Sequence, residues 1–272
     1  MSRLPLRAFL LLLFVVISWG FAAPKVEAAP ARKGPLVVLD PGHGGSNHGA
    51  RGASIGRFEK ELTLILARRT RKALGRLAPR LRVRLTRERD RYLTLAQRVV
   101  LANRWGASVF LSIHLNATKS RSSSGFETYI LSAAASDKEA SRLAYDENRR
   151  GEKTSPSSRG GASEKTGDVA VILHDLAQRA MHARSLHFAK VLQRALAQVR
   201  PTATNLGVRQ APFDVLMGLR MPGALVEVGF IDHVLEGKRM NDPLVQGKIA
   251  EGLARGIVSF LRKRPVPKKA RK

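Results

Sequence analysis

Two histidines in the sequence share the same setting, directly after a short apolar run. His43 follows the letters LVVLDPG, and His114 follows SVFLSI. Between them in the chain, Glu59 and Glu61 begin a segment whose apolar residues recur with helical spacing. Imidazole nitrogens and a carboxylate oxygen suit zinc, which keeps a fourth position open in catalytic sites. The set therefore predicts a metal site, although a helix dipole also favours either glutamate without any metal.

Another candidate for chemistry is Glu227, a carboxylate inside the apolar run GALVEV at positions 223–228. Burying such a group costs free energy unless it is paired or used. Burial would also raise its pKa toward the range that suits proton transfer. The sequence therefore indicates a general acid or base. The structural alternative is a buried carboxylate that an arginine or backbone donors satisfy.

The elements that must position these residues alternate between strand and helix. Short apolar or alternating runs indicate strands, and apolar residues three and four apart indicate helices. The expected strands are 36–39, 81–86, 108–113, 125–131, 213–217 and 223–228, with a turn over 201–207. The expected helices are 58–78, 95–105, 136–149, 169–200 and 243–262, the fourth with Leu176, Phe188, Leu192 and Leu196 among its core residues. This alternation predicts an α/β fold.

The two ends of the chain differ in composition from the middle. Residues 1–28 have the arginines, the apolar run and the small residues of a cleaved secretory signal. A retained membrane anchor is the alternative, but the apolar run is short for a spanning helix. We expect a linker at 29–34, one domain at 35–262 and a basic tail at 263–272. The sequence has no cysteine, which excludes disulfides, thiolate metal ligands and a lipoprotein anchor.

The 272-residue chain is strongly basic, with a formal net charge of +27 at pH 7. Such a charge predicts an anionic partner. Export disfavours nucleic acid and favours anionic polymers of the cell envelope or acidic lipid. The alternative is that the charge reflects only the general composition of the organism's proteins. We expect no nucleic-acid partner, and we expect the protein to be a monomer.

Four separated motifs carry a family resemblance: VVLDPGHGG, a Glu-Lys pair that opens a helix, SIHLNA and LVEVGFI. Their order resembles that of the zinc-dependent N-acetylmuramoyl-L-alanine amidases of the family-3 type, which are bacterial cell-wall hydrolases. The resemblance covers residues 35–262. It implies one zinc ion per chain, held by His43, Glu59 and His114, with Glu61 ranking behind Glu59. It also implies that Glu227 is the catalytic acid and base.

The resemblance has further implications for fold and reaction. It implies a single domain with a twisted, mostly parallel sheet and helices on both faces, in agreement with the alternation of strands and helices. It implies hydrolysis of the amide between N-acetylmuramic acid and L-alanine of the peptidoglycan stem peptide, and a weaker role for Asn116 in orienting substrate. The alternatives are a zinc carboxypeptidase or deacetylase that acts on another envelope polymer, and a non-catalytic wall-binding protein. Asn47-His48 departs from the family pattern, which leaves open whether His48 has gained a role.

An insertion at residues 132–168, rich in Ala, Ser, Arg, Lys and Gly, interrupts the alternation. Long loops of this kind are usually functional or disordered. In several members of the family that the chain resembles, an inserted helix covers the zinc until an activator protein displaces it. The resemblance thus implies an autoinhibitory carboxylate, with Glu147 as first choice before Glu139, Glu152 and Glu164. The alternative is a surface insertion without a role.

Overall fold

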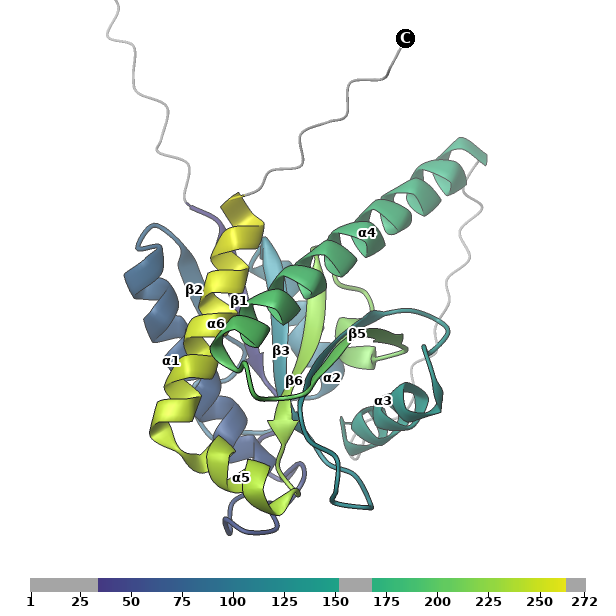
Figure 1. Cartoon of the computed structure of the whole chain (residues 1–272). Helices are drawn as coiled ribbons and strands as arrows, with labels where there is room; N and C mark the ends of the chain where they lie inside the picture. Colours follow the sequence, from purple (N-terminus) through teal and green to yellow (C-terminus); the bar gives the residue numbers. More distant parts are fainter. Residues whose placement is uncertain (1–33, 152–167, 263–272) are drawn as a thin grey trace, which may run out of the picture. The chain divides into compact units, whose positions relative to one another are not determined.

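Strands and helices alternate along most of the chain that the computed structural model describes, residues 34–151 and 168–262 (Figure 1). The strands are β1 (Leu36–Pro41), β2 (Arg82–Leu85), β3 (Val109–Asn116), β4 (Phe126–Leu131), β5 (Asn205–Ala211) and β6 (Gly223–Phe230). The helices are α1 (Glu59–Leu77), α2 (Leu95–Arg104), α3 (Lys138–Gly151), α4 (Asp168–Val199), α5 (Val234–Asn241) and α6 (Pro243–Arg262), with a 3-10 turn η1 (Asp214–Leu216). The structure confirms the α/β prediction.

The six strands form one sheet in the order β2-β1-β3-β6-β4-β5. Every neighbouring pair is parallel except β4 and β6, which run antiparallel. Since β1, β3 and β6 are parallel neighbours, their carboxyl ends meet at one edge of the sheet, where sites form in open α/β folds. The register puts His114 directly opposite Glu227 in the β3–β6 pair.

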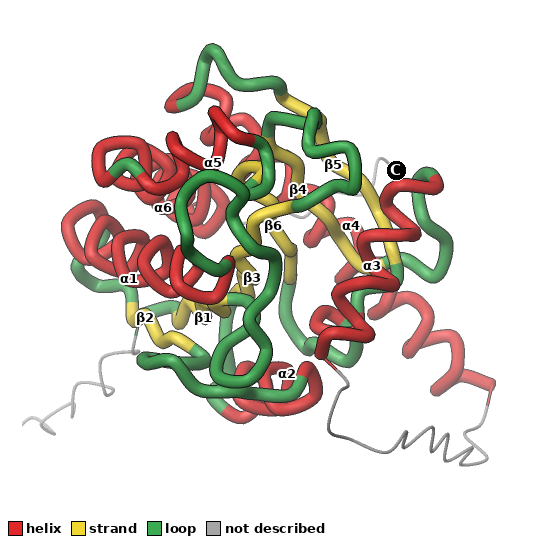
Figure 2. The backbone as a smooth tube through the Cα atoms, turned by 90° about the horizontal axis from the view of Figure 1, so that it is seen from below, coloured by secondary structure: helices red, strands yellow, loops and turns green. Residues whose placement is uncertain are grey.

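Helices cover both faces of the sheet because successive strand residues point to opposite sides. In β1, Val37 and Leu39 face a core that residues of α1, α4 and α6 complete, whereas Val38 faces a second core with residues of α2, α3 and η1. Figure 2 shows the line of strands separating α1 and α6 from α2 and α3. The expected arrangement of helices on both faces is thus confirmed, and α3 lies on the same face as α2.

Of three expectations about the second half of the chain, one was right only in part and two were wrong. Residues 201–203 form the expected turn, but strand β5 already begins at Asn205, before the expected end of the turn at Gly207. The expected strand over 213–217 instead contains η1. In η1 the backbone bonds are local, from the amide of Leu216 to the carbonyl of Phe213 at 3.0 Å. Leu176 is 56% exposed because α4 runs beyond the sheet at its amino-terminal end (Figure 1), whereas Phe188, Leu192 and Leu196 are buried as expected.

The expected signal at 1–28, most of the linker at 29–34 and the basic tail at 263–272 lie outside the described residues. Residues 152–167 of the insertion do so too. Among the residues that are described, no helix combines the length and apolar character needed to cross a membrane.

Candidate metal centre

The backbone after β1 bends sharply where it presents His43. His43 has a φ of 59°, in the left-handed region that side chains with a Cβ rarely occupy. Gly42 precedes it, and a Cβ at Gly42 would lie 2.4 Å from ring atoms of His114. Glycine is therefore required where the segments that carry the two histidines approach each other.

Two buried arginines hold this bend through its carbonyl oxygens. Arg98 donates from Nη1 to the carbonyl of Pro41 at 2.8 Å and from Nη2 to the carbonyl of His43 at 2.7 Å. Arg87 donates from Nε to the carbonyl of Pro41 at 3.0 Å and from Nη2 to that of Gly42 at 2.8 Å. Because these four bonds fix three consecutive carbonyls, they also fix the direction in which the His43 side chain leaves the strand.

Asp40 balances the charge of Arg98 beneath the bend. Its Oδ1 accepts from Arg98 Nη1 at 2.7 Å, and its Oδ2 accepts from the hydroxyl of Ser112 at 2.8 Å. Burial alone would raise the pKa of Asp40, but Arg98 and the hydroxyls of Thr86 and Ser112 lower it below the usual value. The buried pair is therefore ionised and hydrogen-bonded on both sides, as a buried ion pair must be to persist.

Glu59 is the first residue of α1, and its carboxylate is oriented by two backbone amides. Its Oε1 accepts from the amide of Leu115 at 3.0 Å, and its Oε2 accepts from the amide of Ala50 at 3.0 Å. Glu61, the alternative from the sequence, is exposed and accepts instead from the amide of Phe58 at the start of the helix. The structure thus directs Glu59 inward toward the histidines and uses Glu61 as a helix cap.

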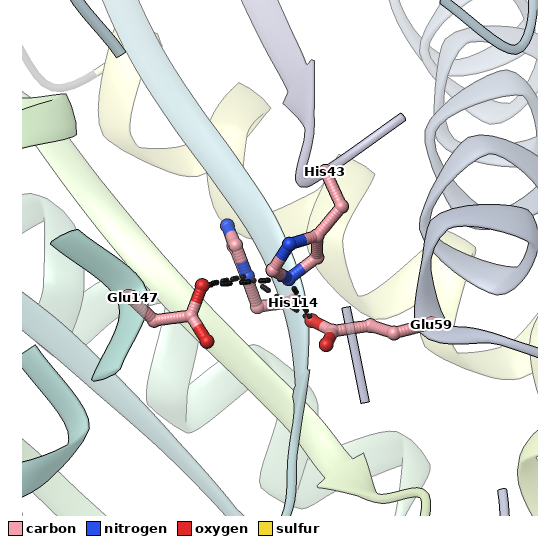
Figure 3. A group of neighbouring side chains, drawn as sticks. All are labelled: His43, Glu59, His114 and Glu147. Atoms are coloured by element: carbon pink, nitrogen blue, oxygen red, sulfur yellow. Dashed lines mark hydrogen bonds and ion pairs between the residues drawn. The ribbon is translucent and has the colours of Figure 1, made fainter. Parts of the chain in front are cut away.

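Four side chains converge at the carboxyl edge of the sheet: His43, Glu59, His114 and Glu147 (Figure 3). Glu59 Oε1 lies 2.9 Å from His43 Nε2 and 3.1 Å from His114 Nδ1. Glu147 Oε2 lies 3.4 Å from His43 Nε2 and 3.5 Å from His114 Nδ1. All four residues are buried, and their candidate ligand atoms lie within 4.8 Å of one another.

This geometry fits a metal ion. Ligands about 2.0–2.1 Å from a tetrahedral zinc ion stand about 3.3 Å apart, close to the separations between the histidine nitrogens and the carboxylate oxygens. His43 Nε2 is buried and has no hydrogen-bond partner among the described residues, although Glu59 Oε1 is 2.9 Å away. The two atoms therefore point toward a shared centre rather than along a hydrogen bond between them.

The charges of the cluster are coupled. Burial alone would lower the pKa of His43, but Glu59 and Glu147 raise it above its ordinary value. Burial alone would raise the pKa of Glu59, but His43 and His114 hold it well below its usual range. The carboxylate is therefore ready to bind a cation, and a metal ion that binds here displaces protons from the cluster.

Asn47 connects His43 to α3, although the sequence offered no role for it. Its Oδ1 lies 3.0 Å from His43 Nδ1, a contact that sets which ring nitrogen faces the centre. Its Nδ2 donates to the carbonyl of Arg150 at 3.0 Å. The neighbouring His48 instead packs on Phe58, with ring centroids 4.8 Å apart, and is not a member of the cluster.

Glu227 lies beside the cluster on β6, 1% exposed. Its Oε2 is buried and has no hydrogen-bond partner within the described chain. Burial, followed by the charges of Glu59 and Glu147, raises its pKa well above the ordinary value. The arginine or backbone partner of the structural alternative is therefore missing at this oxygen, and the group has the raised proton affinity that acid–base chemistry uses.

A row of polar side chains continues from Glu227 across the same face of the sheet. Glu127 on β4 is opposite Glu227 in the antiparallel register and accepts from Asn116 Nδ2 at 2.8 Å. Asn116 Oδ1 accepts from the amide of Ala117, so both ends of the Asn116 amide are already engaged. Arg209 on β5 follows, with Nε 3.1 Å from Glu127 Oε2. Glu127 is a carboxylate inside the apolar run GFETYIL, just as Glu227 is inside GALVEV. The same argument that singled out Glu227 could therefore have identified Glu127 from the sequence.

Helix α3 covers this face, and the contacts of its carboxyl end hold Glu147 at the cluster. Ala140, Leu143 and Ala144 are buried in the core beneath α3. The carbonyl of Gly151 accepts from the hydroxyl of Tyr92 at 2.6 Å. With α3 in this position the cavity at the cluster has a volume of only about 10 Å³, about the space of one water molecule.

The other carboxylates of the insertion lie elsewhere. Glu139 is at the amino end of α3, with Oε2 3.6 Å from Arg209 Nη1. Glu152 and Glu164 lie outside the described residues. The structure thus brings Glu147 to the two histidines and Glu59, and it places Glu139 at the far end of the same helix.

Comparisons with known proteins agree with this architecture. A family described as N-acetylmuramoyl-L-alanine amidase matches residues 37–259. The N-acetylmuramoyl-L-alanine amidase AmiC of Escherichia coli is 32% identical over 248 residues, which are 86% of this chain and 57% of AmiC. AmiA of Escherichia coli K12, with the same enzyme name, is 31% identical over 242 residues, 89% of this chain and 80% of AmiA. The chain thus spans little more than half the length of AmiC.

A solved structure shows the same likeness in three dimensions. The catalytic domain of CwlV, an N-acetylmuramoyl-L-alanine amidase from Paenibacillus polymyxa, matches with a TM-score of 0.60 at 28% identity. The match covers 85% of this chain and 99% of that domain. Nearly the whole of the CwlV domain therefore has a counterpart here.

Proposed function

The chain belongs to the N-acetylmuramoyl-L-alanine amidase family, and from this premise we propose that it is a peptidoglycan hydrolase. The bond cleaved is the amide between N-acetylmuramic acid and L-alanine of the stem peptide. The observation that carries the proposal is the convergence of His43, Glu59 and His114 on one centre next to the buried carboxylate of Glu227.

We assign the metal as zinc, one ion per chain, with His43, Glu59 and His114 as its ligands. Two imidazoles and one carboxylate are a ligand set of catalytic zinc sites. When bound, zinc supplies Lewis acidity, which lowers the pKa of a water molecule and polarises the carbonyl of the scissile amide. The backbone amides that hold Glu59 and the contact of Asn47 with His43 orient the ligands toward the ion.

We assign Glu227 as the general base and then the general acid. It takes the proton of the attacking water and delivers it to the amine of L-alanine as the carbon–nitrogen bond breaks. Its raised pKa supports this assignment, because an acid–base group works best when its pKa lies near the operating pH. Asn116 contributes indirectly, since it holds Glu127 opposite Glu227 in the sheet.

We propose that α3 restrains the enzyme, with Glu147 in the position that water and substrate need. The small cavity left beside the four side chains supports this, because no muramyl peptide fits into about 10 Å³. A restrained form requires a partner that displaces α3, and we expect an activator protein. The competing open form must lie within a few kcal/mol of the closed one.

The remaining parts of the proposal concern location. We propose that residues 1–28 direct export and that the protein acts on the cell wall outside the cytoplasm. The composition of this segment supports export. The charge of +27 supports attraction to anionic envelope polymers once the protein is there.

The decisive experiment identifies the bond. Purified peptidoglycan is digested with the full chain carrying Glu147→Ala, and the fragments are weighed by mass spectrometry. We expect free stem peptides that begin with L-alanine and glycan strands that keep intact lactyl groups. The loss of single terminal residues or of acetyl groups would instead identify a carboxypeptidase or a deacetylase. Intact peptidoglycan would indicate a binding protein.

A further inference from the structure

Arg209 ends the polar row that begins at the candidate metal centre. His114, Glu227, Glu127 and Arg209 stand on the adjacent strands β3, β6, β4 and β5, and their registers turn all four side chains to the face that α3 covers. The row therefore joins the reacting centre to a cation on the edge strand.

The guanidinium of Arg209 contacts the sheet on its inner side and the start of α3 on its outer side. On the inner side, Nε lies 3.1 Å from Oε2 of Glu127, which is 3% exposed. On the outer side, Nη1 lies 3.2 Å from Asp137 Oδ2 and 3.6 Å from Glu139 Oε2, both on partly exposed side chains at the start of α3. Glu127 thus anchors the arginine through Nε, and Nη1 already faces two carboxylates, as in a preformed carboxylate receptor.

Helix α3 fills both ends of this row with carboxylates. Glu147 at its carboxyl end reaches His43 and His114, and Asp137 with Glu139 at its amino end reach Arg209. If α3 excludes substrate, as proposed above, a substrate that displaces the helix would occupy the places of Glu147 at one end and of Asp137 and Glu139 at the other. The position at the two histidines would take the scissile amide. At the other position, Arg209 would be left without the carboxylates of Asp137 and Glu139.

We propose that Arg209 binds a carboxylate of the stem peptide and is a specificity-determining residue of the hydrolase. Arg209 is two strands away from Glu227, a span of roughly 10 Å at strand spacings of about 4.8 Å. An extended peptide covers this span in about three residues at 3.3–3.6 Å each. The carboxylate in question is therefore carried by the second or third residue of the stem. This inference rests on the proposed hydrolase function.

The test compares two substrates in the full chain carrying Glu147→Ala, so that α3 competes less. The first is a muramyl tripeptide with free carboxylates on its second and third residues. The other substrate is the same molecule with both converted to carboxamides. We expect the parent to prefer the carboxylate substrate in kcat/KM by about 10- to 100-fold, mainly through KM, as the loss of a hydrogen bond between charged groups predicts.

Arg209→Gln should abolish this preference, whereas Arg209→Lys, which keeps the charge, should restore part of it. The matched control is Asp137→Asn with Glu139→Gln, which removes the contacts of α3 but keeps the receptor, so the preference should remain. A parent without preference, or an Arg209→Gln chain that keeps it, would overturn the inference while amidase activity stands. A parent that cleaves neither substrate would overturn the proposed function and this inference with it.

Discussion

The buried carboxylates at the sheet differ in the groups that surround them, and these groups determine whether the pKa of each carboxylate is lowered or raised. Asp40 and Glu59 have cations or histidines within hydrogen-bonding distance, which lower the pKa of both groups. Burial raises the pKa of Glu127 and of Glu227, and Arg209 only partly offsets it for Glu127. The lowered pKa keeps Asp40 and Glu59 charged, as a structural ion pair and a candidate metal ligand require. The raised pKa of Glu227 gives it a proton affinity that suits acid–base catalysis.

Glu227→Gln separates proton transfer from metal binding. The amide keeps the size of the side chain, and Glu227 is not a member of the four-residue cluster. We expect metal content to stay at that of the parent while turnover of peptidoglycan falls roughly 10²- to 10⁴-fold, the usual contribution of a general acid or base. His114→Ala is the control and should lose the metal. Turnover near the parent rate would make Glu227 a structural residue.

Asp40→Asn tests the ion pair beneath the bend. The folded-state pKa of Asp40 is lowered, so its charge contributes stability above the unfolded value of about 3.9, and this contribution is lost as pH falls through the folded value. We expect the variant to lose about 3–5 kcal/mol at pH 7, as when a buried pair is broken. The difference should shrink below about pH 4. Urea unfolding of the metal-free chain between pH 3 and 8 measures it.

The control for this prediction is Asp90→Asn, which removes a carboxylate that pairs with Lys60 at 2.8 Å but is 53% exposed. An exposed pair contributes less than about 1 kcal/mol. A constant loss for Asp40→Asn at every pH would show that shape, not charge, explains the effect.

At the scale of elements, α3 is held by contacts at both ends and by a narrow apolar face. Its side chains Asn148 and Glu147 bind the backbone of Pro212 and the cluster, while Asp137 pairs with Arg209 at the other end. The helix itself contributes Ala140, Leu143 and Ala144, two of them alanines, to the buried core on this face. An element that buries few of its own large apolar side chains is a candidate for local opening, which is what a removable cover requires.

Glu147→Ala should raise the basal hydrolysis of peptidoglycan by the full chain. The substitution removes the contact with the two histidines, so the minor open form gains population. A minor form at about 0.1–10% limits the rise to at most roughly 10- to 1,000-fold, which would be reached when every molecule is open. Asp146→Ala is the matched control, because Asp146 is the preceding residue on α3 but pairs with Arg142 on the surface, away from the two histidines. Dye release from labelled sacculi measures the rate, and equal rates in both variants would count against a cover.

Strands and helices with a clear apolar pattern could be predicted from the sequence. Elements that depend on contacts with distant parts of the chain could not. Strands β1, β3 and β6 are continuous apolar runs, so their positions followed from the sequence. Strand β5 is a half-exposed edge strand with the letters NLGVRQA, which lack both alternation and an apolar run. Its residue Arg209 could therefore not be connected to Glu127. Arg87 and Arg98 gave no signal either, because one basic residue among 48 resembles another until the fold brings it to a carbonyl.

At the scale of the whole molecule, the chain carries a net charge of +27, and basic side chains also lie at the edge of the described sheet. Arg82 and Arg84 on the edge strand β2 are exposed. Charged side chains on an edge also protect it from pairing with another sheet. We therefore expect the same charge to serve both solubility and attraction to anionic polymers.

Binding to purified cell-wall sacculi should weaken steeply as salt rises. The screening length falls from about 10 Å at 0.1 M to about 3 Å at 1 M ionic strength, so attraction between exposed charges is lost. Pull-down with the Glu227→Gln chain, which does not consume the sacculi, measures this. Sacculi stripped of their anionic polymers are the control and should bind less at low salt. Equal binding at both salt concentrations would indicate that the positive charge reflects only the general composition of the organism's proteins.

The contact of Glu147 with the two histidines links the position of α3 to the retention of the metal. If α3 is the removable cover proposed above, the closed form would offer the ion four protein ligands, His43, Glu59, His114 and Glu147, and the open form would offer three. By thermodynamic reciprocity, the factor by which the ion favours the closed form is also the factor by which any displacing partner weakens the ion's binding. We therefore expect that, when free zinc is scarce, the closed form retains its metal longest and the open form loses its metal first.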